Sequence, residues 1–235
     1  MPGNGRQTSD RARRQPRSSL LTIDAWLYGF LFVKGWCRIL LLAPALSLAG
    51  CGDRPPPLPG LGSSEVVLAF GDSLTYGTGA ATPESYPVVL SAIIGRPVIS
   101  AGVPGDTTAG GLERLPAVLD EIQPKLMLLC MGGNDMLRKL DSASTEANLR
   151  AMVQLAKSRG IGVVLIGVPA PEIFGGPPAY YARIAQEFAL PLENEALKDI
   201  LFDRSLKADP IHPNAAGYRR FAEAVAALLR KAGAV

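Results

Sequence analysis

Three short apolar runs, each followed closely by glycine, constrain the fold of this chain more than any other feature. They are Val66–Phe70, Leu126–Cys130 and Val163–Ile166. Their apolar residues do not alternate with polar ones, which is typical of strands that are covered on both faces of a parallel sheet. Val98–Ile99 is a shorter strand candidate, and Leu190–Leu192 is at best an edge strand because it contains proline.

The segments between these runs have helical spacing. Apolar residues recur at intervals of three and four in 86–93 and 149–156, and most clearly in 218–229. Pro213 suits the first turn of the last helix, which would place His212 at its cap. Alternating strands and helices predict an α/β fold, a three-layer α/β/α sandwich on a parallel sheet. Ligands of such folds bind beyond the carboxyl ends of the strands.

The charge of the chain is concentrated at its N-terminus. Residues 1–50 carry seven of the 24 Lys and Arg but two of the 21 Asp and Glu, and the rest has a small acidic excess. The body therefore has no basic surplus to neutralise phosphates, and we expect no nucleic-acid binding.

Two apolar runs in the leader, 25–33 and 39–50, are each too short to span a bilayer, which needs about 20 residues. The second run follows Lys34 and Arg38 and ends in Leu48-Ala49-Gly50-Cys51, so it has the organisation of a signal peptide. Its end resembles the lipobox of bacterial lipoproteins, which implies cleavage before Cys51 and lipidation of that cysteine. Two acyl chains anchor firmly. A membrane anchor that is never cleaved is the alternative.

These features predict three parts. Residues 1–50 form the leader, 51–64 a lipidated cysteine with a Pro/Gly-rich tether, and 65–235 one globular domain. A signal peptide usually has about 15–30 residues, so we expect that translation starts at Val33. N-terminal mapping of an unprocessed Cys51→Ala precursor tests that start site.

Polar clusters follow the predicted strands, where the crevice of the sheet should lie. Ser73 stands in Gly71-Asp-Ser-Leu-Thr75, and His212, the one histidine, stands in Asp209-Pro-Ile-His212. A serine hydroxyl becomes a nucleophile when a base takes its proton and a third group orients that base. These residues satisfy that requirement, with Asp209 as the orienting carboxylate. The Ser73 and Gly105 amides and the Asn134 side chain are candidate oxyanion donors.

The motifs Gly71–Thr75, Gly105-Asp106, Gly132–Asp135 and Asp209–His212 together resemble the SGNH-hydrolase (GDSL-esterase) family, in its bacterial thioesterase, arylesterase and lysophospholipase branch. The resemblance covers essentially all of 65–235. It implies a flavodoxin-like sheet, Ser73 as nucleophile, Asp209 and His212 completing a triad, and no cofactor. Many relatives have asparagine where Ser100 stands. This difference concerns the hydrogen bonds that hold the loop before Gly105, and not the catalytic residues. One histidine and no paired cysteines also argue against a metal site.

The chain is thus expected to be a serine esterase that acts on small-molecule carboxylic esters through an acyl-enzyme. Apolar residues in two loops are expected to bind the acyl chain: Met136, Leu137, Ile173 and Phe174, with core packing as the alternative role. A carbohydrate O-deacetylase and a non-catalytic ligand-binding surface lipoprotein are the alternatives. We expect a monomer in the cell envelope, anchored through Cys51 and facing the periplasm, at the outer membrane.

Overall fold

A five-stranded parallel sheet lies at the centre of the fold in this computed structural model, which describes residues 54–171 and 175–235. The strand order is β2-β1-β3-β4-β5, and every neighbouring pair is parallel. This is the order of flavodoxin-like sheets, so the predicted fold class is confirmed. The strands are β1 (Val67–Gly71), β2 (Val98–Gly102), β3 (Leu126–Cys130), β4 (Gly162–Ile166) and β5 (Leu192–Glu193).

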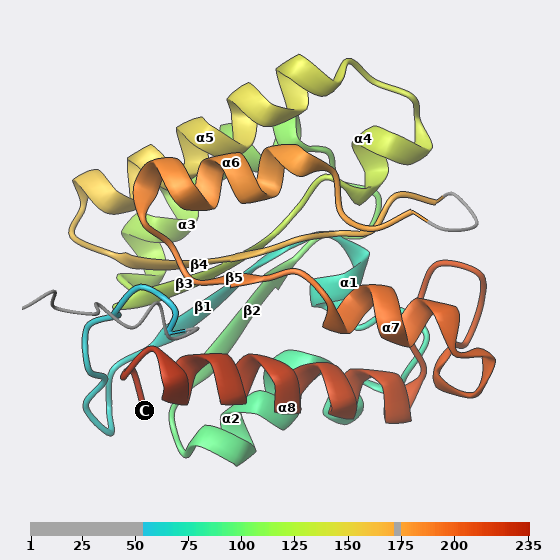
Figure 1. The fold of residues 1–235 in the computed structure, drawn as a ribbon. Helices are drawn as coiled ribbons and strands as arrows, with labels where there is room; N and C mark the ends of the chain where they lie inside the picture. Colours follow the sequence, from blue (N-terminus) through green and yellow to red (C-terminus); the bar gives the residue numbers. More distant parts are fainter. Residues whose placement is uncertain (1–53, 172–174) are drawn as a thin grey trace, which may run out of the picture. The chain divides into compact units, whose positions relative to one another are not determined.

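Helices cover both faces of the sheet. Helices α3, α5 and α6 lie on one face and α2 and α8 on the other, while the short helices α1, α4 and α7 follow the carboxyl ends of strands (Figure 1). The helices are α1 (Ser73–Tyr76), α2 (Tyr86–Ile94), α3 (Thr108–Ile122), α4 (Gly133–Leu137), α5 (Ser142–Ser158), α6 (Ala179–Phe188), α7 (Ala196–Phe202) and α8 (Ala215–Lys231). Two 3-10 turns, Thr82–Glu84 and Arg204–Leu206, complete the elements of the described residues. No helix of the described residues has the length and apolar character needed to cross a bilayer.

The core lies between the sheet and these helices. All residues of β1 and β3 are buried, which agrees with their continuous apolar sequences. On one face, Tyr86 of α2 meets Phe221 of α8 edge to face with ring centroids 4.7 Å apart. Both side chains are fully buried, and burying one such side chain contributes roughly 1.5–3 kcal/mol. This contact fixes α8, and with it the loop that precedes α8.

Several element boundaries differ from the sequence prediction. Strand β2 continues to Gly102, and β5 is only Leu192–Glu193. The position of Pro213 in the last helix was predicted wrongly, because Asn214 is the N-cap and its side chain accepts a hydrogen bond from the Gly217 N–H at 3.0 Å. An asparagine oxygen satisfies a free amide of the first turn, which proline cannot do. His212 therefore lies in the loop before the helix.

Part of the segment that we expected to be a free tether is packed on the domain. The N–H groups of Leu58 and Leu61 donate to the carbonyls of Ala232 and Ala234, each at 2.9 Å, and Leu61 is buried. These two leucines give the Pro/Gly-rich segment enough apolar surface to bind beside the C-terminus. The predictions for residues 1–53, including the leader, Val33 and Cys51, lie outside the described residues.

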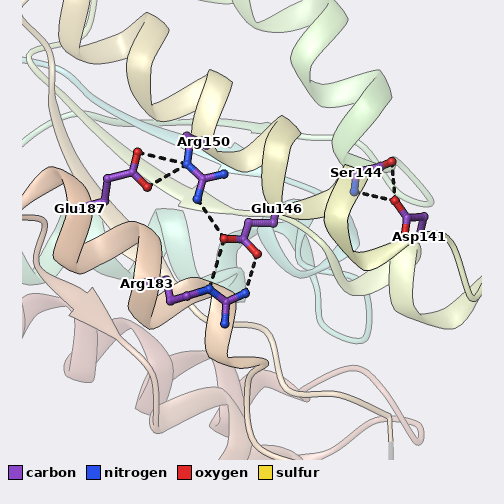
Figure 2. A network of polar contacts seen from close by, with 6 residues as sticks. All are labelled: Asp141, Ser144, Glu146, Arg150, Arg183 and Glu187. Carbon is purple, nitrogen blue, oxygen red and sulfur yellow. Dashed lines mark hydrogen bonds and ion pairs between the residues drawn. The ribbon is translucent and has the colours of Figure 1, made fainter. Parts of the chain in front are cut away.

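A network of ion pairs links α5 to α6 on the surface (Figure 2). Glu146 accepts hydrogen bonds from Arg150, at 2.9 Å, and from Arg183, while Arg150 also contacts Glu187 at 2.8 Å. The hydrogen bond from Arg183 is the main reason that the pKa of Glu146 lies below its ordinary value. Because one carboxylate serves two arginines, the network joins the two helices more firmly than an isolated surface pair.

Candidate active site

The side chains of Ser73, His212 and Asp209 form one hydrogen-bonded line. His212 Nε2 lies 2.9 Å from Ser73 Oγ, and His212 Nδ1 lies 2.7 Å from Asp209 Oδ2. The hydroxyl and the imidazole are 139 positions apart in the sequence, so the fold alone brings them together. An imidazole with one nitrogen at a hydroxyl and the other at a carboxylate can accept the hydroxyl proton while the carboxylate stabilises the resulting cation.

The loop that carries Asp209 and His212 is held by its own backbone. Asp209 Oδ1 accepts the N–H groups of Ile211, at 2.8 Å, and His212, at 2.9 Å, so the second carboxylate oxygen is aimed at the imidazole. Partial burial raises the pKa of Asp209, but the bonds from His212 and these amides outweigh it and the net pKa is lowered. Asp209 is consequently a carboxylate at neutral pH, and its negative charge can stabilise a positive charge on the His212 imidazole.

Ser73 is presented by a sharp turn between β1 and α1. Asp72 caps α1 by accepting the Leu74 N–H at 3.0 Å, and Ser73 is the first residue of that helix. Gly71 ends the strand where a Cβ would overlap the Thr75 side chain and the Cys130 carbonyl, so glycine is required for this close approach. The turn places the Ser73 hydroxyl at the carboxyl edge of the sheet.

Asp72 is a functional candidate that sequence reasoning missed. Its side chain is 1% exposed, and its Oδ2 lies 3.3 Å from Asn134 Nδ2. Burial raises its pKa to about 6, against the lowering effects of the Leu74 amide and the charge of His212. Asp72 stands in the Gly71–Thr75 motif, but no pattern in the sequence shows that its carboxyl is enclosed.

The three candidate oxyanion donors come from three different strand ends. Ser73 and Asn134 line one cleft with His212, while Gly105 lies in the turn after β2, with a left-handed φ of 78°. The Gly105 carbonyl accepts Arg138 Nη2 at 2.7 Å, which fixes this peptide. Within the described residues, neither the Ser73 N–H nor the Gly105 N–H donates to another protein group. Both amides are therefore available to a ligand.

Asn134 is oriented by two acceptors. Its Nδ2 donates to the Asp106 carbonyl at 2.9 Å and more weakly to Asp72 Oδ2 at 3.3 Å. Its neighbour Asp135 is buried and accepts the Thr108 N–H at 2.9 Å and the Thr108 hydroxyl at 2.6 Å. The first turn of α3 is thus joined directly to α4. A negatively charged oxygen beside Asn134 needs only to replace the longer bond to Asp72.

Arg114 stabilises the turn that contains Gly105 and Asp106. Its Nε pairs with Asp106 at 2.8 Å, its Nη2 donates to the Gly71 carbonyl at 2.9 Å, and its guanidinium lies 4.0 Å from the centre of the Phe70 ring. One side chain therefore joins the end of β1 to the turn that contains Gly105. The spacing of Asp106 and Arg114 across a loop and a helix gave no sign of this contact in the sequence.

A cleft of about 290 Å³ opens beside Ser73 and His212. Its wall is mostly apolar, and the apolar lining residues are Leu74, Leu137, Val168, Pro169, Ala170, Pro171, Leu201, Phe202, Pro210 and Ile211. Of the predicted acyl-binding residues, Leu137 lines this cleft, while Met136 packs against the core and does not. Ile173 and Phe174 lie outside the described residues. Within the described part of the chain, no cluster of ligating side chains suits a metal ion.

The chain matches known proteins over most of its length. Residues 69–220 match the model of the GDSL-like Lipase/Acylhydrolase family. The chain belongs to this family. Esterase TesA of Pseudomonas aeruginosa is 31% identical over 201 residues, which cover 80% of this chain and 96% of that protein. Thioesterase 1/protease 1/lysophospholipase L1 of Escherichia coli K12 is 32% identical over 160 residues, which are 65% of this chain and 77% of that protein.

Solved structures agree with this placement in the GDSL family. The crystal structure of TesA superimposes with a TM-score of 0.64 at 32% identity, covering 72% of this chain and 99% of that one. The SGNH-hydrolase family esterase AlinE4 gives a TM-score of 0.57 at 33% identity, covering 74% and 98%. The expected family is confirmed, and this GDSL-family chain is a hydrolase of ester bonds.

Proposed function

We propose that the protein is a serine esterase that hydrolyses carboxylic esters through an acyl-enzyme formed on Ser73. The observation that carries this proposal is the line of hydrogen bonds from Ser73 Oγ through His212 to Asp209, with contacts of 2.9 and 2.7 Å. The line opens onto a mostly apolar cleft, where an acyl group or an aryl group can be buried.

The first half of the reaction forms the acyl-enzyme. His212 Nε2 takes the proton of Ser73 Oγ as that oxygen bonds to the ester carbon, and the carbonyl electron pair moves onto its oxygen. The N–H groups of Ser73 and Gly105 and the Asn134 amide stabilise this oxyanion. When the tetrahedral species collapses, the bond to the alcohol oxygen breaks and His212 returns the proton to that oxygen.

The second half repeats these steps with water. His212 removes a proton from a water molecule whose oxygen attacks the acyl carbon, and the same donors hold the second oxyanion. Collapse breaks the bond to Ser73 Oγ, which recovers its proton from His212, and the carboxylic acid leaves. Asp209 keeps the imidazole in one orientation throughout and stabilises its cationic form without becoming protonated.

Labelling by a fluorophosphonate probe tests this mechanism. The wild-type protein should be labelled, Ser73→Ala should not, and His212→Asn should be labelled far more slowly. Thr78→Ala is a matched control that removes a hydroxyl close in sequence to Ser73, and it should be labelled like the wild type. A wild-type protein that resists the probe would support a non-catalytic ligand-binding protein instead.

The apolar cleft favours arylesters, lysophospholipids or other acyl esters as substrates over acetylated sugars. A two-domain esterase described as active on acetylated mannans shares this fold, with a TM-score of 0.61, at 19% identity, which concerns the fold alone. A panel of p-nitrophenyl esters of rising chain length, run beside acetylated oligosaccharides, separates the two. Faster release of acetate from the oligosaccharides would replace our proposal by a carbohydrate O-deacetylase.

We also propose that the enzyme is a monomeric lipoprotein of the cell envelope, anchored through Cys51 and facing the periplasm at the outer membrane. The sequence Leu48-Ala49-Gly50-Cys51 supports this location. Metabolic labelling with an alkyne fatty acid should mark the wild type and not Cys51→Ala. Fractionation of the membranes and sedimentation of the detergent-solubilised protein test the location and the oligomeric state.

A further inference from the structure

The cleft beside Ser73 carries an excess of positive charge. Lys198, Arg204 and Lys207 line it, and Asp72 is the acidic residue among the lining side chains. Asp72 is buried and its carboxyl group accepts bonds from the protein itself, the Leu74 N–H and the Asn134 amide. It therefore does little to neutralise the three cations that line the cleft.

Two of these cations have no counter-charge among the residues that the structure describes. Lys198 pairs with Glu195 at 2.8 Å. In contrast, Arg204 and Lys207 form no ion pair with any residue in the described ranges. Two cations without an ion-pair partner can bind an anionic group. The apolar wall of the same cleft can bind an apolar part of the same ligand.

The acidic residues closest to them in the sequence are already bound elsewhere. Asp203 accepts the N–H and the hydroxyl of Ser205, at 2.9 and 2.7 Å. Asp209 is bound to the imidazole of His212. The two cations on this segment are consequently left to interact with solvent or with a ligand in the cleft.

The backbone that carries Arg204 and Lys207 is fixed to the His212 loop. Lys207 forms an antiparallel bridge with Pro213, and the Ala208 N–H donates to the His212 carbonyl at 3.0 Å. Asn214 Nδ2 also donates to the carbonyls of Ser205, at 2.8 Å, and Lys207, at 3.3 Å. The two cationic side chains therefore start from a backbone of defined position relative to the imidazole.

The position of these cations selects one side of the substrate. In the proposed mechanism His212 Nε2 protonates the departing alcohol oxygen, so that oxygen lies beside the His212 loop when its bond to the acyl carbon breaks. Arg204 and Lys207 belong to the segment that pairs with this loop, whereas Asn134 and Leu137 come from the separate helix α4. An anionic group that reaches the cations thus belongs to the alcohol and not to the acyl part of the ester.

We propose that Arg204 and Lys207 bind an anionic group, a phosphate or a carboxylate, on the alcohol part of the ester substrate. The inference rests on the esterase function proposed above and names its substrate class as esters of anionic alcohols. Acylated glycerol phosphate has this chemistry: the phosphate meets the cations, the ester meets Ser73, and the acyl chain lies on the apolar wall.

Hydrolysis of matched soluble esters tests the proposal. The first pair is 1-hexanoylglycerol and 1-hexanoylglycerol 3-phosphate, which differ only in the anion on the alcohol. The second pair is p-nitrophenyl pentanoate and p-nitrophenyl hemiglutarate, in which the anion is on the acyl part. The quantity measured is kcat/KM for the anionic ester divided by kcat/KM for the neutral one, in the wild type and in Arg204→Gln/Lys207→Gln.

For the first pair, this ratio should fall about tenfold in the double variant, since each cation that solvent can reach contributes modestly to binding an anion. The ratio for the second pair should stay constant. Arg219→Gln/Lys231→Gln is the control: it removes the same charge from exposed positions on α8 that do not line the cleft, and it should leave both ratios unchanged. Added salt should lower the first ratio in the wild type and much less in the cleft variant.

Three results would overturn the inference: an unchanged first ratio in the cleft variant, an equal fall in the control variant, or an equal fall in the second ratio. The single variants Arg204→Gln and Lys207→Gln give the same answer if the double variant fails to fold. Fluorophosphonate labelling of each variant distinguishes this failure from failure of the proposed function, because an esterase that ignores the phosphate is still labelled at Ser73.

Discussion

Replacing the buried carboxyl of Asp72 by an amide should change how stability depends on pH. Burial raises the pKa of Asp72 from its ordinary value of 3.8 to about 6. Between these two values the folded protein keeps a proton that the unfolded chain has released, so the free energy of unfolding falls as pH rises. The contribution is complete below pH 3.8 and is lost once the pH passes 6.

The size of the effect follows from the same two values. A difference of about two pH units at roughly 1.4 kcal/mol each amounts to roughly 3 kcal/mol. Asp72→Asn does not titrate and should lack this loss. Its new amide would face the Asn134 amide, donor to donor, which costs about 1 kcal/mol, but that cost does not change with pH.

Urea unfolding of both proteins, from about pH 3.5 to about pH 7, measures the prediction. The stability of the wild type minus that of Asp72→Asn should decrease by roughly 3 kcal/mol across this range. Asp141→Asn is a control with the opposite sign. Asp141 is exposed, and its pKa is lowered by the Ser144 hydroxyl and amide. The stability of the wild type relative to Asp141→Asn should therefore increase as pH rises. A constant difference between the wild type and Asp72→Asn would refute the reasoning.

Three further changes test the packing and the cleft. Gly132→Ala should destabilise the fold by about 2 kcal/mol or more in urea unfolding, because φ is 116° and the new Cβ would press on the Tyr181 hydroxyl; unchanged stability would contradict this. Glu146→Gln should lower the melting temperature by a few degrees at low salt and by less in 1 M salt, since it removes the carboxylate between two arginines; a salt-independent change would argue against an ionic cause. Leu137→Ala should reduce kcat/KM for long-chain esters more than for acetate esters, and an equal loss on both would exclude an acyl-binding role.

The central sheet was predictable because its strands carry a strong local pattern. Residues 126–130 are apolar throughout, and this strand is predicted with its observed bounds. Strand β2 was predicted as two residues because Ser100, Ala101 and Gly102 have no apolar pattern, yet they pair in register with β1 at the edge of the sheet. Pairing by backbone hydrogen bonds needs no particular side chain, so the sequence does not reveal how far such a strand extends.

Some of the contacts between residues far apart in the sequence were likewise predictable, and others were not. The Asp209-x-x-His212 spacing and the scarcity of histidine identified the candidates in advance, and the structure brings both to Ser73. The enclosure of Asp72, and the Arg114 contact with Asp106, depend on which neighbours the fold supplies. These are properties of tertiary packing and have no local pattern.

The division of the reacting groups between the two ends of the domain has a consequence for synthesis. Ser73 lies in the first helix and His212 just before the last, separated by 139 positions. A polypeptide interrupted before residue 212 retains the Ser73 hydroxyl but lacks the imidazole that serves as base in the proposed mechanism. If the proposed mechanism holds, such nascent and truncated chains are inert towards esters in whichever compartment they are made.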